Sequence, residues 1–274
     1  DVMRQVPVRT IMHVIGIPAA ELADMKRWSD AITDSFTRPF FDAPTLERTE
    51  QAFVEMRDVF LREIAARRAS PRDDFLTHLV NAADEGGAMT EDELVSQLIF
   101  LLPAGHDSTT NTMVLGLVAL LRDRSLWERF RDTPDRLNEN IVELMRFVAM
   151  SATSNRVATE DFELHGKTIR KGDFVLLLIA SANRDPRAFP DPERLDPDRR
   201  NDMQLVFGSG AHHCLGHMLA KQEIAELLTA IMERFPDIEL RDEEPAFTNA
   251  FSFRGLAHLW SYPHGRTRHV DSAS

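Results

Sequence analysis

Residues 207–216 read Phe-Gly-Ser-Gly-Ala-His-His-Cys-Leu-Gly, a glycine-rich stretch that leads into a helical pattern. Gly208, Gly210 and Gly216 let the backbone turn tightly and come close to a flat cofactor, because no side chain intervenes. Cys214 falls at the expected start of the helix, where free amide donors and the positive dipole end stabilise thiolate over thiol. The stretch therefore indicates a thiolate that can act as an iron ligand.

Two other interpretations of this thiol stay open. Cys214 is the single cysteine of the chain, so an internal disulfide is excluded, and a lone cysteine is commonly an inert buried group. A zinc site would combine Cys214 with His212, His213 and His217. His213 and His217 are one helical turn apart, but Cys214 lies between them and no CxxC pair supports zinc.

The same ten residues resemble the cysteine-loop pattern of the cytochrome P450 family, FGxGxHxCxG, at each fixed position. The resemblance implies that Cys214 ligates the iron of haem b, with the loop glycines against the cofactor. It also implies that Phe207 packs against the haem near the sulfur and that His212 bonds a haem propionate. A thiolate ligand pushes electron density onto haem iron and favours O–O cleavage.

One long helix is expected from Thr90 to about Leu121, a length of about 45 Å at ~1.5 Å per residue. Thr90 followed three residues later by Glu93 is a capping-box signature. Pro103 denies one backbone donor and Gly105 weakens the next turn, so we expect a local distortion in the middle of the helix.

Polar residues interrupt this apolar helix at 104–109, where the sequence is Ala-Gly-His-Asp-Ser-Thr. The segment resembles the family's oxygen-activation motif, which implies that Asp107 relays protons and that Ser108 or a water passes them on. The catalytic candidates are Asp107, Ser108 and Thr109, and the candidates for cofactor contact are Ala104 and Gly105. The family usually has Thr in place of Ser108. Apart from the resemblance, hydroxyls in a helix centre commonly bond back to carbonyls.

Glu143 and Arg146 lie three residues apart on one helix face, which taken alone describes a common surface pair. The spacing resembles the family's ExxR motif, a buried pair that a third residue completes, and Arg194 is the residue expected to do so. The motif would serve folding and haem retention. Arg156 matches a family arginine that pairs with a haem propionate, the alternative being an exposed arginine at a sheet edge.

The remaining elements follow from periodicity and from proline and glycine. Core-facing helices are expected from Pro18 to about Leu79, with breaks at Arg38-Pro39 and Ala69–Pro71, and apolar stripes formed by Leu22, Met25 and Trp28 and by Phe53, Met56, Phe60 and Ile64. Further expectations are a helix from Pro134 to Phe147, a small antiparallel sheet from Phe162 to Ile179 with a turn at His165-Gly166, a meander from Arg184 to Arg199, and a final helix after Cys214 with Leu215, Leu219, Ile224, Leu227, Leu228 and Ile231 on one face.

The predicted fold class is mainly α with a small antiparallel β-sheet, which resembles a P450 fold lacking its first helices. We expect a single domain over 1–274, with a polar, disordered tail at 263–274. Met150 stands where the family commonly has proline, and Leu195 where it has an aromatic residue. The first residues carry no signal-peptide pattern and do not begin with Met, so we expect a chain that starts partway through a longer protein.

Composition narrows the possible partners. The chain has 44 acidic against 32 basic residues and a net charge of −12, which disfavours nucleic acids and anionic membranes. The longest apolar stretch, 98–104, is far shorter than the ~20 residues of a membrane span. The single cysteine fits a reducing cytoplasm.

The resemblance as a whole implies a monooxygenase that inserts one atom of O2 into a small apolar substrate, with electrons from a ferredoxin or flavoprotein. A peroxide-driven peroxygenase is an alternative, although such members tend to replace the acid-alcohol pair. Another alternative is a truncated haem-binding or recruitment module without turnover. Because the front helices of the family find no counterpart, we expect this chain alone to retain haem poorly.

Overall fold

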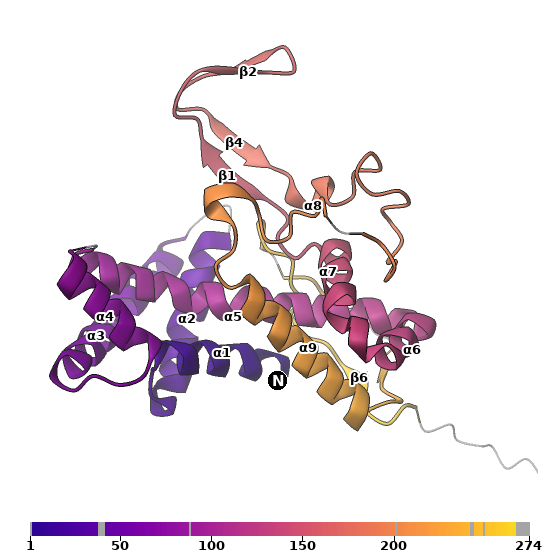
Figure 1. Cartoon of the computed structure of the whole chain (residues 1–274), viewed down its shortest axis with the longest axis horizontal. Coiled ribbons are helices and arrows are strands. Elements are labelled where there is room, and N and C mark those ends of the chain that lie inside the picture. Colours follow the sequence, from indigo (N-terminus) through magenta and orange to yellow (C-terminus); the bar gives the residue numbers. More distant parts are fainter. Residues whose placement is uncertain are drawn as a thin grey trace, which may run out of the picture. The chain divides into compact units, whose positions relative to one another are not determined.

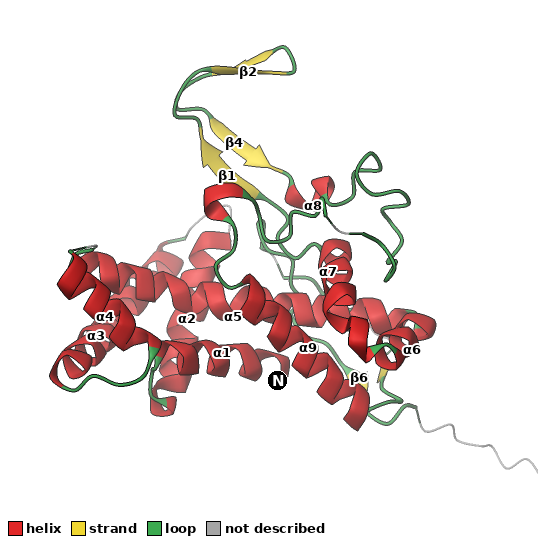
Figure 2. Ribbon diagram, in the orientation of Figure 1, coloured by secondary structure: helices red, strands yellow, loops and turns green. Residues whose placement is uncertain are grey.

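The structure is a computed structural model that describes residues 2–37, 42–87, 89–200, 202–241, 244–248 and 250–266 (Figure 1). The described part is mostly helical, and its strands form short antiparallel pairs (Figure 2), as the sequence predicts. The chain divides into two compact units, Asp1–Thr110 and Asn111–Ser274. The single domain stays a prediction.

The first unit is helical. Its elements are α1 (Val2–Ile15), η1 (Ala19–Glu21), α2 (Leu22–Thr37), α3 (Ala43–Ala69), α4 (Phe75–Gly86) and the first part of α5 (Glu91–Arg122). The predicted break at Ala69 is confirmed, and the one at Arg38-Pro39 lies outside the described residues. The capping box is also confirmed, since Thr90 N donates to Glu93 Oε2 at 2.7 Å and Glu93 N to Thr90 Oγ1 at 3.3 Å.

Helices α2 and α3 pack together through the predicted stripes. Met25, Trp28, Met56, Phe60 and Ile64 are all buried in one apolar core. The prediction for Phe53 was wrong, because this side chain is 38% exposed. It lies at the margin of the α3 stripe, where Thr49 and Ala52 face the core instead.

Helix α1 was not predicted from the sequence. Pro7 lies inside it, where the ring removes one backbone donor, and the helix continues past it. Val8, Ile11, Met12 and Ile15 are buried at helical spacing. That spacing was the signal that could have identified the helix.

One buried arginine, Arg67, connects three segments of the first unit. The Arg67 side chain is fully buried on α3, and it bonds Glu63 at 2.5 Å and Asp74 at 2.7 Å. It also donates to the carbonyl oxygen of Gly16, which has a φ of +93° after α1. An added Cβ at Gly16 would lie 2.6 Å from Asp74 Oδ2, so glycine is required there.

The second unit contains the rest of α5 and most of the connecting segments. Its other helices are α6 (Arg124–Asp132), η2 (Pro134–Arg136), α7 (Leu137–Val148), α8 (Ile179–Ala182), η3 (Gly210–His212) and α9 (His217–Arg234). The predicted helix at 134–147 and the final helix are confirmed. Helix α6 was missed, although Asp123 caps it by accepting from Ser125 N and Leu126 N. Helices α7 and α9 pack against each other.

The strands form three two-stranded antiparallel sheets among the described residues, whereas the sequence suggested one small sheet. The pairs are β1 (Ser154–Val157) with β4 (Phe174–Leu177), β2 (Phe162–Leu164) with β3 (Lys167–Ile169), and β5 (Glu239–Leu240) with β6 (Ser261–Tyr262). The β2–β3 hairpin continues outward from the β1–β4 pair, so the four strands do not align side by side (Figure 1). Its turn is at His165 and Gly166 as predicted, with φ of +48° and +71°.

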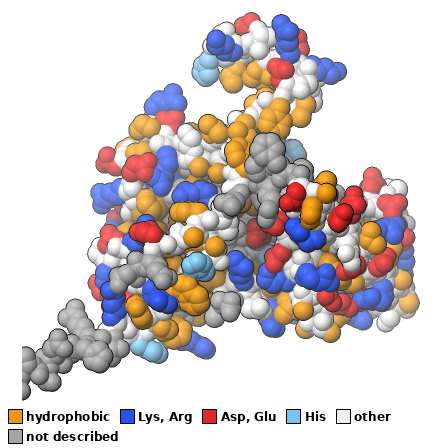
Figure 3. All heavy atoms as spheres, turned by 180° about the vertical axis from the view of Figure 1, so that it is seen from behind, with side chains coloured by type: hydrophobic (Ala, Val, Ile, Leu, Met, Phe, Trp, Pro, Cys, Tyr) orange, Lys and Arg blue, Asp and Glu red, His pale blue; other side chains and the backbone are white. Residues whose placement is uncertain are grey.

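Two further sequence assignments at the ends of strands and helices need correction. The predicted strand run to Ile179 ends at Leu177, and Ile179 begins α8 instead. Leu215 was assigned to the apolar face of the final helix, but α9 begins only at His217 and Leu215 is 83% exposed. Apolar side chains also lie exposed on the β1–β4 pair, Val157 and Phe174 among them, and Figure 3 shows apolar atoms along the projecting strands.

The proline-rich meander is confirmed as a loop without helix or strand from Arg184 to Arg199, held by its own turns. In the predicted tail, Gly265 N still donates to Tyr262 O at 3.2 Å. Residues 267–274 lie outside the described part, so disorder there stays a prediction. None of the described helices combines the length and the apolar character that a bilayer-spanning segment requires.

Candidate cofactor site

The glycine-rich loop holds Cys214 just before α9. The Cys214 amide donates to the Phe207 carbonyl oxygen at 2.8 Å, which closes the loop. Gly208 and Gly210 have φ of +69° and +67°, a left-handed conformation that favours glycine. The thiol is half-buried, and Gly216 is the N-cap of α9. The predicted place of the thiol near the start of a helix is therefore confirmed, with two residues between Cys214 and the first residue of α9.

The surface around the thiol fits a flat, apolar cofactor. A Cβ added at Gly210 or Gly216 would meet no atom within 4 Å, and one at Gly208 would meet only a carbonyl oxygen at 3.4 Å. Leu215 and Met218 are 83% and 63% exposed beside the thiol. Large apolar side chains at such exposure favour a covering ligand. An open glycine loop, one soft sulfur ligand and exposed apolar groups are the donor set and the shape that haem requires.

The histidines near the thiol do not converge on a metal. Within the residues that the structure describes, no three His, Cys, Asp or Glu side chains lie close enough to hold an ion. The His213 and His217 rings contact edge to face with centroids 4.7 Å apart, and His217 Nδ1 lies 3.0 Å from the Cys214 carbonyl oxygen. The zinc interpretation therefore lacks a ligand set in this part of the chain. His212 is exposed on η3, where the resemblance expects a propionate contact.

A buried ion network is centred on α7 in the same unit. Glu143 and Arg146 on α7 are completely buried, and Arg146 donates to both carboxylate oxygens, through Nε at 2.7 Å and Nη2 at 2.9 Å. This bidentate pair is stronger and more directional than a surface pair. The guanidinium also donates to the carbonyl oxygens of Asn183, Pro192 and Arg194. The pair thus ties the meander to α7, as the resemblance implies.

The third residue of the network is Arg199, and the prediction of Arg194 was wrong. Arg199 Nε donates to Glu143 Oε1 at 3.1 Å, with its side chain 8% exposed. Arg194 is exposed and takes part only through its backbone carbonyl oxygen. Both arginines lie in the meander, and the fold of that loop decides which of them points back.

Asn183 connects this network to the cysteine loop. Its backbone carbonyl accepts from Arg146 Nη1 at 2.8 Å, and its side-chain Oδ1 accepts from the Leu205 amide at 2.8 Å. Leu205 in turn accepts from the Gly208 amide at 3.0 Å. Sequence reasoning missed Asn183, whose full burial gives it no periodic signal.

Arg156 lies in the middle of strand β1, opposite Val175. Its side chain is exposed and Nη1 donates to Ser154 Oγ at 2.9 Å and to the Asn155 carbonyl at 2.7 Å. An exposed strand arginine is one of the two interpretations that the sequence left open. A propionate contact for this guanidinium stays a prediction.

In the first unit, the acid-alcohol segment forms one turn of α5. The Ser108 hydroxyl donates to the Ala104 carbonyl at 3.2 Å and the Thr110 hydroxyl to the His106 carbonyl at 2.8 Å. Such back-bonding is the ordinary behaviour of helix hydroxyls. Thr109 is buried, whereas Asp107 and Ser108 are half-buried. Ser108 must therefore exchange this bond for another acceptor before it can pass a proton.

Burial changes the protonation of two neighbours in this turn. Desolvation raises the pKa of Asp107 to about 6, and Asp30 on α2 adds to the effect, while Lys26 opposes it. Desolvation lowers the pKa of His106 to about 4. A carboxyl group that titrates near neutral pH suits proton transfer.

The helix passes through this segment as an unbroken α-helix, so the expected distortion at Pro103 does not interrupt it. One missing hydrogen bond is tolerated where the flanking turns are intact. Gly105 is explained by packing, because a Cβ there would lie 2.5 Å from Ile11 Cγ1 of α1. Contact between Gly105 or Ala104 and a cofactor stays a prediction.

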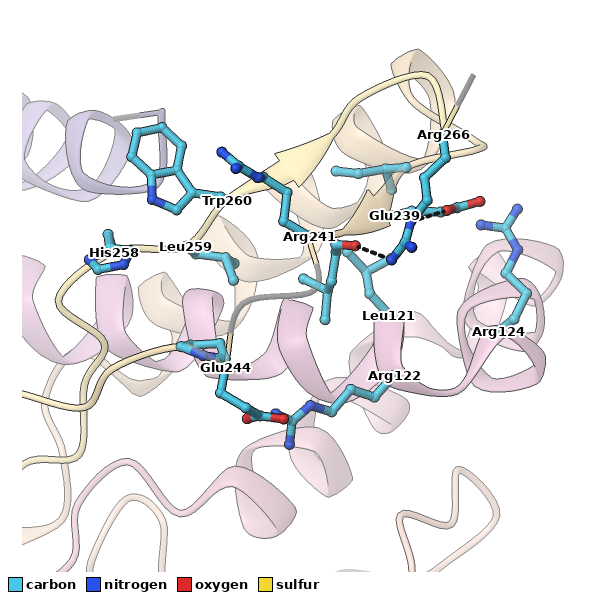
Figure 4. A pocket seen from close by; sticks show the side chains of 13 residues that line it. Leu121, Arg122, Arg124, Glu239, Arg241, Glu244, His258, Leu259, Trp260 and Arg266 are labelled. Atoms are coloured by element: carbon cyan, nitrogen blue, oxygen red, sulfur yellow. Dashed lines mark hydrogen bonds and ion pairs between the residues drawn. The ribbon is translucent and has the colours of Figure 1, made fainter. Parts of the chain in front are cut away.

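A groove of about 430 Å³ lies elsewhere in the second unit, near the end of α5 and the β5–β6 pair (Figure 4). Its charged lining is largely self-paired. Arg122 bonds Glu244 at 2.6 Å, and Arg266 lies 3.5 Å from Glu239. None of the predicted site residues lines it.

A thiol on a glycine loop before the last long helix, braced by a buried Glu-x-x-Arg network, is the arrangement typical of haem-thiolate proteins. The profile of the family described as Cytochrome P450 matches residues 7–137 and 135–256. This chain belongs to the cytochrome P450 family.

Individual relatives agree with this assignment. The polyketide biosynthesis cytochrome P450 PksS of Bacillus subtilis (strain 168) is 35% identical over 267 residues, which cover 94% of this chain and 64% of the relative. The mycinamicin IV hydroxylase/epoxidase of Micromonospora griseorubida is 39% identical over 240 residues, 86% of this chain and 59% of the relative. The chain thus spans less than two thirds of these relatives.

A solved structure supports the fold. P450BioI, in complex with an acyl carrier protein ligated to hexadec-9Z-enoic acid, superposes with a TM-score of 0.88 at 29% identity. The match covers 94% of this chain and 66% of that one. The predicted fold is confirmed for this portion of a cytochrome P450.

Proposed function

We propose that this chain is the haem-binding portion of a monooxygenase. The overall reaction inserts one atom of O2 into a C–H bond and releases the other as water, consuming two electrons and two protons. The observation that carries the proposal is Cys214 on its open glycine loop, with apolar Leu215 and Met218 exposed beside it. Haem b, when bound, would supply the binding and activation of O2.

The residues of the second unit would hold the cofactor. Cys214 would ligate the iron as a thiolate, and the glycines of its loop would let the backbone lie against the porphyrin. The fully buried Glu143–Arg146 pair would keep the loop in place through Asn183 and Leu205. His212 and Arg156, both exposed, are the side chains proposed to bind the two propionates.

The residues of the first unit would supply protons. The Asp107 carboxyl has a pKa of about 6, so near neutral pH it exists in both forms and could take a proton from solvent and release it. The Ser108 hydroxyl, now bonded to the Ala104 carbonyl, would turn to pass the proton on. Serine lacks the methyl group that restrains threonine, so this rotation is less hindered.

The substrate and partner classes are also proposals. One similar protein is named as a hydroxylase/epoxidase and another for polyketide biosynthesis, which suggests a predominantly apolar substrate. The electrons would come from a ferredoxin or flavoprotein. An intact thiolate ligand also favours a reducing cytoplasm as the place of action.

The test of this function is turnover with a ferredoxin, its reductase and NADPH, measured as NADPH oxidation together with peroxide release. We expect Ser108→Ala to keep NADPH oxidation but to divert about tenfold more of the electrons to peroxide, since proton delivery is impaired. Ser96→Ala is the matched control, because the Ser96 hydroxyl makes the same kind of back-bond about three turns earlier in α5, to Asp92 O at 2.7 Å.

Two outcomes would count against this function. If neither the wild type nor the Ser108→Ala variant oxidises NADPH, the chain does not perform the reaction. If Ser96→Ala and Ser108→Ala release peroxide equally, Ser108 has no special part in it.

A further inference from the structure

The acid-alcohol turn of α5 is fixed to two neighbouring helices of the first unit. On one side Gly105 packs against Ile11 of α1 without room for a Cβ. On the other side, the Ser29 hydroxyl of α2 lies 2.6 Å from His106 Nε2. These contacts involve the two residues directly before Asp107 and Ser108, the pair to which the proposed function assigns proton delivery.

The Ser29–His106 hydrogen bond is dry. Ser29 is 0% and His106 3% exposed, and the two residues are 77 positions apart in the sequence. A buried imidazole that lost its partner would incur the full desolvation penalty of the unpaired nitrogen. The bond therefore fixes the rotation of α5 about its axis relative to α2 at this one turn.

The ring of His106 is neutral at physiological pH, since burial lowers its pKa to about 4. A neutral imidazole has one donor and one acceptor nitrogen, so the bond depends on the tautomer and adds no charge beside Asp107. Near neutral pH the contact can thus hold position without itself taking part in proton exchange.

The same face of α2 carries charges that act on Asp107. Lys26 and Asp30 form an ion pair at 2.5 Å, with side chains 22% and 51% exposed. Asp30 and Asp34 raise the pKa of Asp107, while Lys26 of α2 and Arg4 of α1 lower it. A shift of α2 along α5 would change the distances from Asp107 to Lys26, Asp30 and Asp34 together.

We propose that Ser29 and His106 are positioning residues, whose buried hydrogen bond holds α2 on α5 and keeps bulk water away from the Asp107 carboxyl. From the proposed function the proposal takes only the role of this turn in proton delivery. The hydrogen bond itself is observed independently of that function.

The experiment is a titration of the Asp107 carboxyl by ¹³C NMR in the 274-residue chain without haem, with Asp107→Asn used to assign the signal. In Ser29→Ala and in His106→Leu, water replaces the lost partner, and we expect the midpoint to fall by about one pH unit toward that of a hydrated carboxyl. Amide exchange at residues 104–110 should become about tenfold faster, because the turn loses a buried bond.

Matched variants separate positioning from simple loss of stability. Ser35→Ala removes a hydroxyl of the same helix that bonds only Ile32 O, at 2.7 Å, and should leave the Asp107 midpoint unchanged. His106→Gln has a side-chain amide that can bond Ser29, so the titration midpoint of Asp107 in this variant should lie close to that of the wild type. If Ser29→Ala does not fold, Ser29→Cys keeps the volume and weakens the bond.

The proposal is overturned if Ser29→Ala and Ser29→Cys lower stability while the Asp107 midpoint stays in place, or if Ser35→Ala moves it equally. Since no readout involves haem or turnover, failure of the proposed function would appear separately, as absence of haem binding or of NADPH oxidation.

Discussion

Glu143 carries a negative charge in the buried network of α7, and two arginines bond it. Replacing it by Gln would leave Arg146 buried without its counter-charge. We expect Glu143→Gln to lower the free energy of unfolding by about 3–5 kcal/mol, as is typical when one partner of a buried pair is removed. Urea unfolding of the two proteins measures the difference, and a loss below about 1 kcal/mol would contradict the described network.

The meander offers a matched pair of arginines. Arg199→Ala removes the bond to Glu143 and should cost about 2 kcal/mol, because the carboxylate loses a buried donor. Arg194→Ala should change stability by less than about 0.5 kcal/mol, since only its backbone takes part and its side chain is exposed. Equal urea midpoints for the two variants would show that the side-chain assignment is wrong.

Asp107 makes stability depend on pH in a direction opposite to that of most carboxylates. Its folded pKa, about 6, lies above the ordinary 3.8, so the folded state binds the proton more tightly and is destabilised as pH rises from 3.8 to 6. Asp107→Asn removes this term. Relative to the wild type it should gain about 2 kcal/mol between pH 4 and pH 7, and a constant difference across that range would contradict the shift.

At this scale, the sequence predicted the chemistry of single residues better than their partners. Cys214 and the Glu143–Arg146 pair lie where their motifs place them, because a glycine turn and a three-residue helix spacing are local properties. Arg199 was missed because it lies only five positions from Arg194 in an irregular loop, and the path of that loop decides which side chain reaches Glu143. The Ser29–His106 bond joins residues 77 positions apart, and no local pattern reports it.

The packing of α1 on α5 depends on the missing side chain of Gly105. Gly105→Ala should lower the free energy of unfolding by about 1–3 kcal/mol, because its Cβ would overlap Ile11. In the double variant with Ile11→Ala the added methyl has room. We expect the two effects to be less than additive in thermal unfolding, and strict additivity would show that the two side chains do not compete for the same space.

At Gly216 in the cysteine loop, unlike at Gly105, we expect an added methyl group to be tolerated. Its added Cβ would meet no atom within 4 Å, so Gly216→Ala should change the stability of the haem-free chain by less than about 1 kcal/mol. Haem affinity should fall, because the methyl group would occupy space proposed for the porphyrin. Equal haem titrations of wild type and variant would argue against contact between Gly216 and the cofactor.

Helices were predicted from apolar periodicity and caps, as for α3, α5 and α9, whereas the strand pairs were predicted less well. A three-residue strand carries little period-2 signal, and its neighbour is set by the path of the chain. The result was one expected sheet in place of three pairs. Helix α1 was also missed, although four of its buried positions lie at helical spacing.

At the scale of the whole molecule, the expectation of a single domain can be tested with the three tryptophans. Trp28 lies in the first compact unit, and Trp127 and Trp260 lie in the second. In each of two variants, one that keeps only Trp28 and one that keeps only Trp127, the urea midpoint is measured by tryptophan fluorescence and by circular dichroism. If the chain unfolds as one cooperative domain, the two methods should give the same midpoint within each variant. A fluorescence midpoint that differs from the circular-dichroism midpoint of the same variant would show two domains.

Ligation of haem iron by the Cys214 sulfur as a thiolate can be measured in the absorption spectrum of the reduced, carbon-monoxide-bound chain after reconstitution with haem. We predict the red-shifted Soret band of thiolate ligation, and its loss in Cys214→Ala. A band typical of histidine ligation, or a spectrum that Cys214→Ala leaves unchanged, would show that Cys214 does not ligate the iron.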